Sequence, residues 1–146
     1  MKKYIILATQ LSTIFILGIL LLMPIIRNTS LDMEATMIGS FFLAFGVSGV
    51  VGFFWKTKVG YMATLTFQYF TTILFFFSAL AWKGNFLFNS SITAISGLSF
   101  YAVFLLNSEA FRKDYGHETV GYGRNITSVI LGLLVAASLA ILYHHT

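Results

Sequence analysis

The chain has 146 residues, of which 58% are hydrophobic and 10% are charged, and its formal net charge is +4. Because soluble domains carry about 25% charged residues, this composition argues against a water-soluble fold and predicts one helical membrane domain over residues 1–146. The absence of cysteine excludes a disulfide framework, a thiolate metal site and a thiol nucleophile.

Five hydrophobic stretches without charged residues occupy most of the chain: Tyr4–Ile26, Ala35–Trp55, Tyr61–Trp82, Phe86–Asn107 and Ile126–Tyr143. A helix needs roughly 20 apolar residues to cross a bilayer core, and a length of about 18 is the lower limit. We therefore predict an all-α, polytopic membrane helix bundle with five transmembrane helices. Four spans are the alternative, if the serine-rich stretch Phe86–Asn107 is only re-entrant.

Lysine and arginine residues predict the orientation of these helices. With five spans, one side carries seven of them: Lys2, Lys3, Lys56, Lys58, Arg112, Lys113 and Arg124. The other side carries Arg27 and Lys83. The positive-inside rule places the richer side in the cytoplasm. We expect a cytoplasmic N-terminus, an outer C-terminus, and cytoplasmic segments 56–60 and 108–125.

Small residues mark the second stretch as a close-packing helix. The candidates for helix packing or oligomer contacts are Gly39, Gly46, Ser48, Gly49 and Gly52. Ala44, Ser48 and Gly52 are spaced as a small-xxx-small ridge, and such ridges let helix backbones approach closely in lipid. We expect this helix to pack tightly within one copy or between copies of a homo-oligomer. A glycine hinge for gating is the alternative.

Polar residues form a stripe on the third stretch. Thr64, Gln68 and Thr71 recur at steps of three and four residues, so they share one helix face. Gln10 in the first stretch lies at a similar depth, roughly 10 Å at 1.5 Å per residue, and is expected in the same layer. The stripe predicts either interhelical hydrogen bonds or the lining of a pore.

Asp, Glu, Lys, Arg and His are absent from all five stretches. Proton relays, ion pathways and voltage sensors usually place such residues inside the membrane. General acid–base catalysis also requires titratable groups. We therefore expect a non-enzymatic protein that needs no cofactor or metal.

The segment between the last two stretches, residues 108–125, reads SEAFRKDYGHETVGYGRN. Ser108 can cap a short helix, Glu109 can pair with Arg112 or Lys113 one turn later, and Gly116 is expected to end the helix. This amphipathic cytoplasmic loop would lie against lipid headgroups or bind a cytosolic protein. The candidate partner-binding residues are Glu109, Phe111, Arg112, Lys113 and Tyr115.

Within this loop, Thr119-Val120-Gly121-Tyr122-Gly123 resembles the selectivity filter of potassium channels, in which carbonyls from four copies replace the hydration shell of the ion. The resemblance implies a tetrameric channel with Gly121 and Tyr122 in the pore. Arg124 follows where the family usually has aspartate, and the charge distribution places the segment in the cytoplasm.

In size and span pattern the chain resembles small membrane subunits of bacterial anti-phage defence systems, such as Kiwa, and immunity or exclusion proteins. This resemblance implies an oligomeric bacterial inner-membrane protein, with a tetramer favoured. It would act as a sensor or anchor for a cytosolic partner in antiviral defence, without binding nucleic acid directly. The alternative is a tetrameric ion channel that uses the TVGYG segment or a conduit lined by threonine and glutamine.

Overall fold

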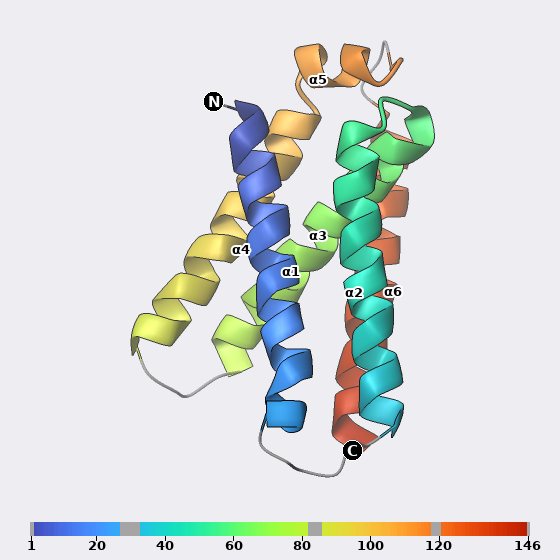
Figure 1. Ribbon diagram of the computed structural model, residues 1–146. Coiled ribbons are helices and arrows are strands. Elements are labelled where there is room, and N and C mark those ends of the chain that lie inside the picture. The colour runs from blue at the N-terminus through green and yellow to red at the C-terminus, as the bar shows by residue number, and fades with distance from the viewer. Residues whose placement is uncertain (1, 27–32, 82–85, 118–120, 146) are drawn as a thin grey trace.

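The computed structural model describes the backbone of residues 2–26, 33–81, 86–117 and 121–145, and side-chain surroundings within 3–19, 40–80, 89–117 and 121–138. The described residues form an all-α fold of six helices (Figure 1). They are α1 (Lys2–Ile26), α2 (Met33–Phe54), α3 (Lys58–Ala81), α4 (Phe86–Leu106), α5 (Glu109–Asp114) and α6 (Tyr122–His145). The five long helices agree with the five predicted stretches to within about one turn at every end.

The long helices run back and forth along the bundle, and the two termini lie at opposite ends (Figure 1). Helix α3 is central and packs most extensively against α4, α2 and α6, whereas α1 packs on α2 and α4. The short helix α5 lies across the end that holds the N-terminus and the turn between α2 and α3 (Figure 1). The segments predicted to share one side of the membrane therefore meet at one end of the bundle.

Two helices are long and apolar enough to cross a bilayer: Lys58–Leu80 with 23 residues and Asn89–Leu106 with 18. Within the described side chains, α1 and α2 contribute shorter apolar segments, Lys3–Ile19 and Ser40–Phe54. By length and composition, this part of the chain thus supports two of the five predicted spans. Helix α4 is continuous over 21 residues, without the break that a re-entrant segment would need.

Glycines of α2 bring its backbone close to α1 and α3. A Cβ atom on Gly49 would lie 2.7 Å from Cβ of Phe67, and one on Gly46 would lie 2.9 Å from Cγ1 of Ile14. A Cβ on Gly52 would meet the Gly60 carbonyl oxygen at 2.7 Å. These glycines therefore mediate packing inside one copy of the chain.

Within one copy of the chain, the packing face of α2 is not the small-xxx-small ridge of Ala44, Ser48 and Gly52. Ala44 and Ser48 lie on the exposed side of the helix, and the Ser48 hydroxyl donates to the Phe45 carbonyl. The buried face instead follows Gly46, Gly49 and Gly52. Gly39 lies outside the residues whose surroundings are described.

Helix α6 packs on α3 through another set of small residues. Ser128 is fully buried, and a Cβ on Gly132 would lie 3.0 Å from the backbone nitrogen of Phe70. Ala136, one turn further, is partly buried and packs against an apolar cluster that includes Phe67 and Phe70 of α3. Ser128, Gly132 and Ala136 have the four-residue spacing of a small-xxx-small ridge, which the sequence analysis did not single out.

Candidate functional site

A layer of buried polar side chains joins α1 to α3. Nε2 of Gln68 donates to the Ile6 carbonyl at 3.2 Å and lies 3.0 Å from the Thr9 hydroxyl. Gln68 has no exposed surface and Thr9 very little. The Gln68 side chain therefore ties α3 to the backbone and side chains of α1.

The same layer reaches α2 through the Gly49 carbonyl oxygen. This oxygen accepts hydrogen bonds from Nε2 of Gln10 and from the Thr64 hydroxyl, both at 3.1 Å. Gln10 and Gln68 thus share a layer but bond to different groups and not to each other. Because Gly49 carries no side chain, its backbone can approach both donors.

All three predicted pore residues of α3 are fully buried within one copy of the chain. Gln68 and Thr64 make the interhelical bonds described above, and the Thr71 hydroxyl donates to the Phe67 carbonyl of its own helix. A conduit lined by these side chains would require the bundle to open.

For Gln68→Leu we expect the free energy of unfolding to fall by about 1 kcal/mol, because two interhelical hydrogen bonds of roughly 0.6 kcal/mol each are lost. Unfolding in mixed micelles would measure the loss. Thr93→Val, on the exposed face of α4, is the matched control and should change nothing. If purified Gln68→Leu assembles normally but abolishes a single-channel conductance, the residue lines a pore instead.

At the end of the bundle, two asparagine side chains join α4 to α6. Nδ2 of Asn107 donates to Oδ1 of Asn125 at 3.0 Å, and Nδ2 of Asn125 donates to Oδ1 of Asn107 at 2.8 Å. The hydroxyls of Tyr69 and Tyr61, both on α3, donate to Asn125 and Asn107 respectively. The sequence analysis missed this pair, because the two residues are far apart in sequence and each sits at the edge of an apolar stretch.

Helix α5 ends as the sequence predicts, in a left-handed turn at Gly116 with φ of 73°. The Gly116 N–H donates to the Lys113 carbonyl and the His117 N–H donates to the Arg112 carbonyl, both at 3.0 Å. This pattern is a Schellman motif, in which glycine tolerates the positive φ. Ser108 occupies the N-cap position, but its buried hydroxyl forms no hydrogen bond, so the predicted cap bond is not made.

Three of the five predicted partner-binding residues face the bundle. Phe111 and Tyr115 are buried, and Arg112 is 8% exposed. The Tyr115 hydroxyl donates to the Phe53 carbonyl at 2.5 Å, and Nε of Arg112 donates to the Asn107 carbonyl at 2.9 Å. These side chains therefore dock α5 on the bundle rather than display it.

Burial next to the negative charge of Asp114 and the ring of Tyr61 raises the pKa of Tyr115 to about 12. The Tyr115 hydroxyl accordingly stays protonated and remains a hydrogen-bond donor to Phe53 at physiological pH. Its ring centroid lies 5.5 Å from that of Tyr61, so α5 and α3 are also joined by an aromatic pair.

The other two predicted partner-binding residues lie on the outer face of α5. Nζ of Lys113 and Oε1 of Glu109 form an ion pair of 2.7 Å, with both side chains more than 60% exposed. This is the predicted pairing one turn apart. The hydrogen bond from Lys113 lowers the pKa of Glu109, so this carboxyl group is ionised at neutral pH.

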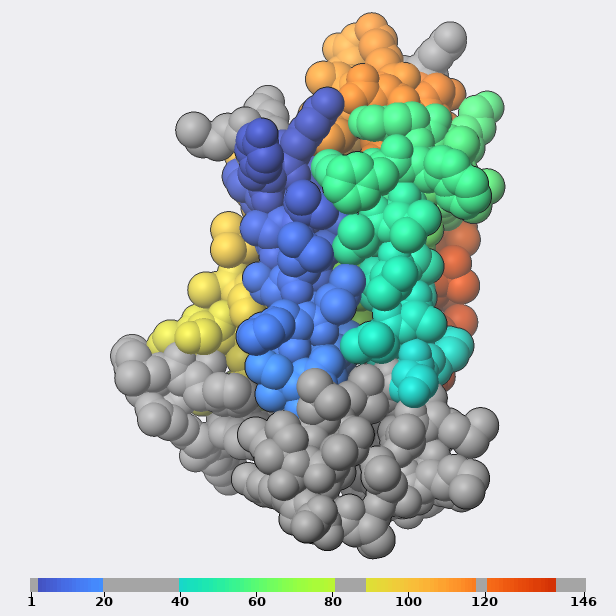
Figure 2. All heavy atoms as spheres, viewed as in Figure 1, coloured from blue at the N-terminus to red at the C-terminus, as the bar shows by residue number. Residues whose placement is uncertain are grey.

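Asp114 connects three segments that are distant in sequence. Its carboxylate lies 3.2 Å from Nζ of Lys56 and 3.7 Å from Nζ of Lys3. Nζ of Lys56 also lies 4.7 Å from the ring centroid of Tyr115. Space-filling side chains show α5 covering this end of the bundle, above α1 and the turn between α2 and α3 (Figure 2).

Lys56, through a hydrogen bond and its charge, and to a lesser degree Lys3 lower the pKa of Asp114. A carboxylate with a lowered pKa stabilises the docked state above its ordinary pKa near 3.9, and this contribution is lost as pH falls through the lower value. The ion pairs of Asp114 therefore stay constant between about pH 5 and pH 8. Exposed pairs of this kind contribute about 0–1 kcal/mol each.

Only the second half of the TVGYG segment can be compared with a potassium filter, because Thr119 and Val120 lie outside the described residues. Tyr122 and Gly123 form the first turn of α6. The Gly121 carbonyl accepts from the Asn125 N–H at 3.2 Å, and the Gly123 carbonyl accepts from the Thr127 hydroxyl at 2.9 Å. These two carbonyls are engaged within the chain, whereas filter carbonyls face the ion.

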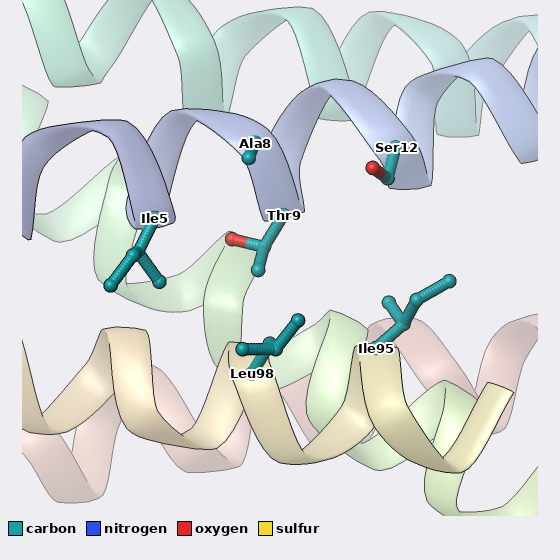
Figure 3. Close-up of a pocket in the computed structure, with 6 residues that line it drawn as sticks. All are labelled: Ile5, Ala8, Thr9, Ser12, Ile95 and Leu98. Carbon is teal, nitrogen blue, oxygen red and sulfur yellow. The ribbon is translucent and has the colours of Figure 1, made fainter. Parts of the chain in front are cut away.

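A cavity of about 140 Å³ lies between α1 and α4. Figure 3 shows the side chains that line it: Ile5, Ala8, Thr9 and Ser12 from α1, facing Ile95 and Leu98 from α4. This lining is mostly hydrocarbon, so the cavity suits an apolar chain rather than a polar cofactor. In the part of the chain that the structure describes, no group of three or more His, Asp or Glu side chains could hold a metal.

Comparisons of the chain with protein-family models, with curated proteins and with solved structures found no match. The resemblance to membrane subunits of anti-phage defence systems stays a prediction from size and span pattern.

Proposed function

We propose that the chain is an integral membrane protein with five spans, and that α5 and the N-terminus lie on the cytoplasmic side of a bacterial inner membrane. The distribution of side chains supports this proposal, because uncharged polar groups are buried while many large apolar side chains are exposed. Gln10 and Gln68 have no exposed surface, whereas Phe15 and Phe104 are 68% and 70% exposed. Large exposed apolar surface marks sites that contact membrane or protein.

The exposed apolar residues are distributed over all five long helices. They include Phe15 on α1, Phe41 on α2, Phe76 and Phe77 on α3, Phe100 and Phe104 on α4, and Ile126, Ile130 and Leu134 on α6. A lipid environment would solvate these side chains. Both glutamines and the threonines at positions 9, 13, 64 and 71 are buried instead, where their polar groups can find partners that lipid does not offer.

We propose further that the protein is a non-enzymatic, homo-oligomeric sensor or anchor that presents α5 to a cytosolic partner. One observation carries this proposal: α5 contacts groups from four helices or turns. Asp114 pairs with Lys3 and Lys56, Tyr115 bonds to Phe53, and Arg112 bonds to the residue that follows α4. A change in the packing of the spans would therefore reach the outer face of α5.

A pore is the second candidate function, and the buried polar layer is the observation that favours it. Oε1 of Gln10 is buried without a hydrogen-bond partner, so the interior retains an unused acceptor. An open state that hydrated this layer would satisfy that oxygen. Planar-bilayer recording of the purified protein tests this candidate, and potassium-selective current lost on Gly121→Ala would favour it over the anchor.

For the sensor or anchor function, Lys113→Glu should abolish co-purification of a soluble protein from native membranes, because it reverses a charge on the outer face of α5. Leu134→Ala, on an exposed apolar face of α6, is the control that should retain the partner.

Single cysteines at positions 113 and 146 verify the orientation, because the chain has none of its own. An impermeant maleimide added to spheroplasts should label only position 146. Labelling at 113, or a partner unaffected by Lys113→Glu, contradicts the proposal.

A further inference from the structure

His117 follows the C-terminal turn of α5, and its ring packs against α3. Its backbone N–H completes the Schellman motif at the Arg112 carbonyl, and its ring centroid lies 5.1 Å from that of Tyr61 in an edge-to-face arrangement. The residue is 7% exposed, and its Nε2 atom is buried without a hydrogen-bond partner. Because His117 sits at the very end of the bundle, a small displacement would bring this nitrogen to water.

A neutral imidazole tolerates this position better than a protonated one. With the proton on Nδ1, Nε2 is only an acceptor, and leaving an acceptor unpaired is a limited cost. Protonation adds a buried N–H donor on Nε2 and leaves a charged group without its hydrogen bond. The geometry alone therefore favours the neutral form while α5 is docked.

The charged groups around His117 act in the same direction. The groups that face it are Tyr61 and Lys58 from α3, Arg112 from α5, and Arg124 from α6. Burial first, and then the positive charges of Arg124, Lys58 and Arg112, lower the pKa of His117. A further positive charge beside these three would be repelled.

We propose that His117 is a proton-operated latch. Its protonation releases the end of α5 from the bundle, so that α5 undocks when the surrounding solution acidifies. The latch concerns the docking of α5 itself and needs no partner. It deepens the proposed function only by saying how the presented surface would be regulated.

The direction of the pH dependence follows from the two states of the histidine. In an undocked segment the imidazole titrates near its ordinary pKa of about 6.5, and in the docked segment it titrates lower. The docking constant is therefore largest above about pH 6.5 and falls with pH, by up to tenfold per pH unit. The weakening stops below the docked pKa. The ion pairs of Asp114 do not change between pH 5 and pH 8, so they do not mask this effect.

Double electron–electron resonance on the full-length chain in lipid nanodiscs tests the latch. Spin labels are placed at Val59→Cys, in the first turn of α3, and at Ala110→Cys, on the exposed side of α5. The distance between them reports the separation of α5 from α3. At pH 8 we expect one distance. Between pH 6.5 and pH 5 a second, longer distance should appear, with the ratio of long to short rising by up to tenfold per pH unit.

His117→Phe keeps a ring against Tyr61 but cannot take up a proton, so its distance distribution should be the same at pH 8 and pH 5. His117→Gln provides a second variant without titration should the phenylalanine disturb the fold, and it should behave likewise. An unchanged distribution in the parent protein across this range would overturn the latch. The same titration in His117→Phe or His117→Gln would overturn it too.

Discussion

Gly60→Ala is expected to lower the free energy of unfolding by about 3 kcal/mol, at the upper end of the usual cost of overpacking. A Cβ atom on Gly60 would lie 2.6 Å from the Gly52 carbonyl oxygen and closer still to the carbonyl oxygen of Trp55. Both neighbours are backbone atoms, which cannot rotate away as a flexible side chain could. The turn between α2 and α3 would have to shift as a unit.

Reversible unfolding in mixed micelles, followed by circular dichroism, measures this loss. Gly97→Ala is the matched control, because Gly97 lies on the exposed face of α4 with no atom within 4 Å of the added methyl group. Its stability should be unchanged or higher by up to about 1 kcal/mol, through the better helix propensity of alanine. If Gly60→Ala loses no more stability than Gly97→Ala, the crossing of α2 and α3 has room for the added methyl group, which contradicts the prediction.

Tyr115→Ala is expected to weaken the docking of α5 by about 3–5 kcal/mol, the usual cost of truncating a buried aromatic residue. The substitution removes the ring pair with Tyr61, the hydrogen bond to Phe53 and the cation–π contact with Lys56. The long helices should keep their packing, because α5 lies only across their end. Tyr115→Phe retains the ring and should cost about 1 kcal/mol.

Limited trypsin digestion in nanodiscs measures this opening. Arg112 is a trypsin site that is buried when α5 is docked, so its cleavage tracks the open population. A loss of about 3 kcal/mol corresponds to a cleavage rate about a hundredfold higher, at 1.4 kcal/mol per factor of ten. Cleavage at Lys58, in the first turn of α3, serves as an internal control. Unchanged cleavage at Arg112 in Tyr115→Ala would show that the Tyr115 ring does not hold α5 against the bundle.

Because α5 is docked on the bundle, substitutions in residues 108–125 have to be chosen by the face on which they lie. Exchanging Arg112 and Lys113 together would combine two effects, because Arg112 bonds to the end of α4 whereas Lys113 lies on the surface. Substitution at Lys113 or Glu109 tests the outer face, and substitution at Arg112 or Tyr115 tests docking. The two classes of variant therefore separate binding of a partner from presentation of the surface.

The sequence by itself determined the number, length and order of the long helices and the gathering of basic residues at one end. These are properties of each segment alone. The length of an uncharged stretch, and the positions of Lys3, Lys56 and Lys113 along the chain, do not depend on which helix packs beside it. The end of α5 at Gly116 was predictable for the same reason, since its positive φ is a local requirement.

Only the tertiary structure decided which face of each helix turns inward. Ser48 and Gly49 are adjacent small residues, but the crossing of α2 with Phe67 of α3 selects Gly49. Phe111, Arg112 and Tyr115 share the amphipathic loop with Lys113, yet the positions of Phe53 and Asn107 turn the first three inward. A helix can be rotated about its axis without changing its hydrophobic length. Its orientation is therefore set by the shapes and hydrogen-bonding groups of its neighbours, which lie far away in sequence.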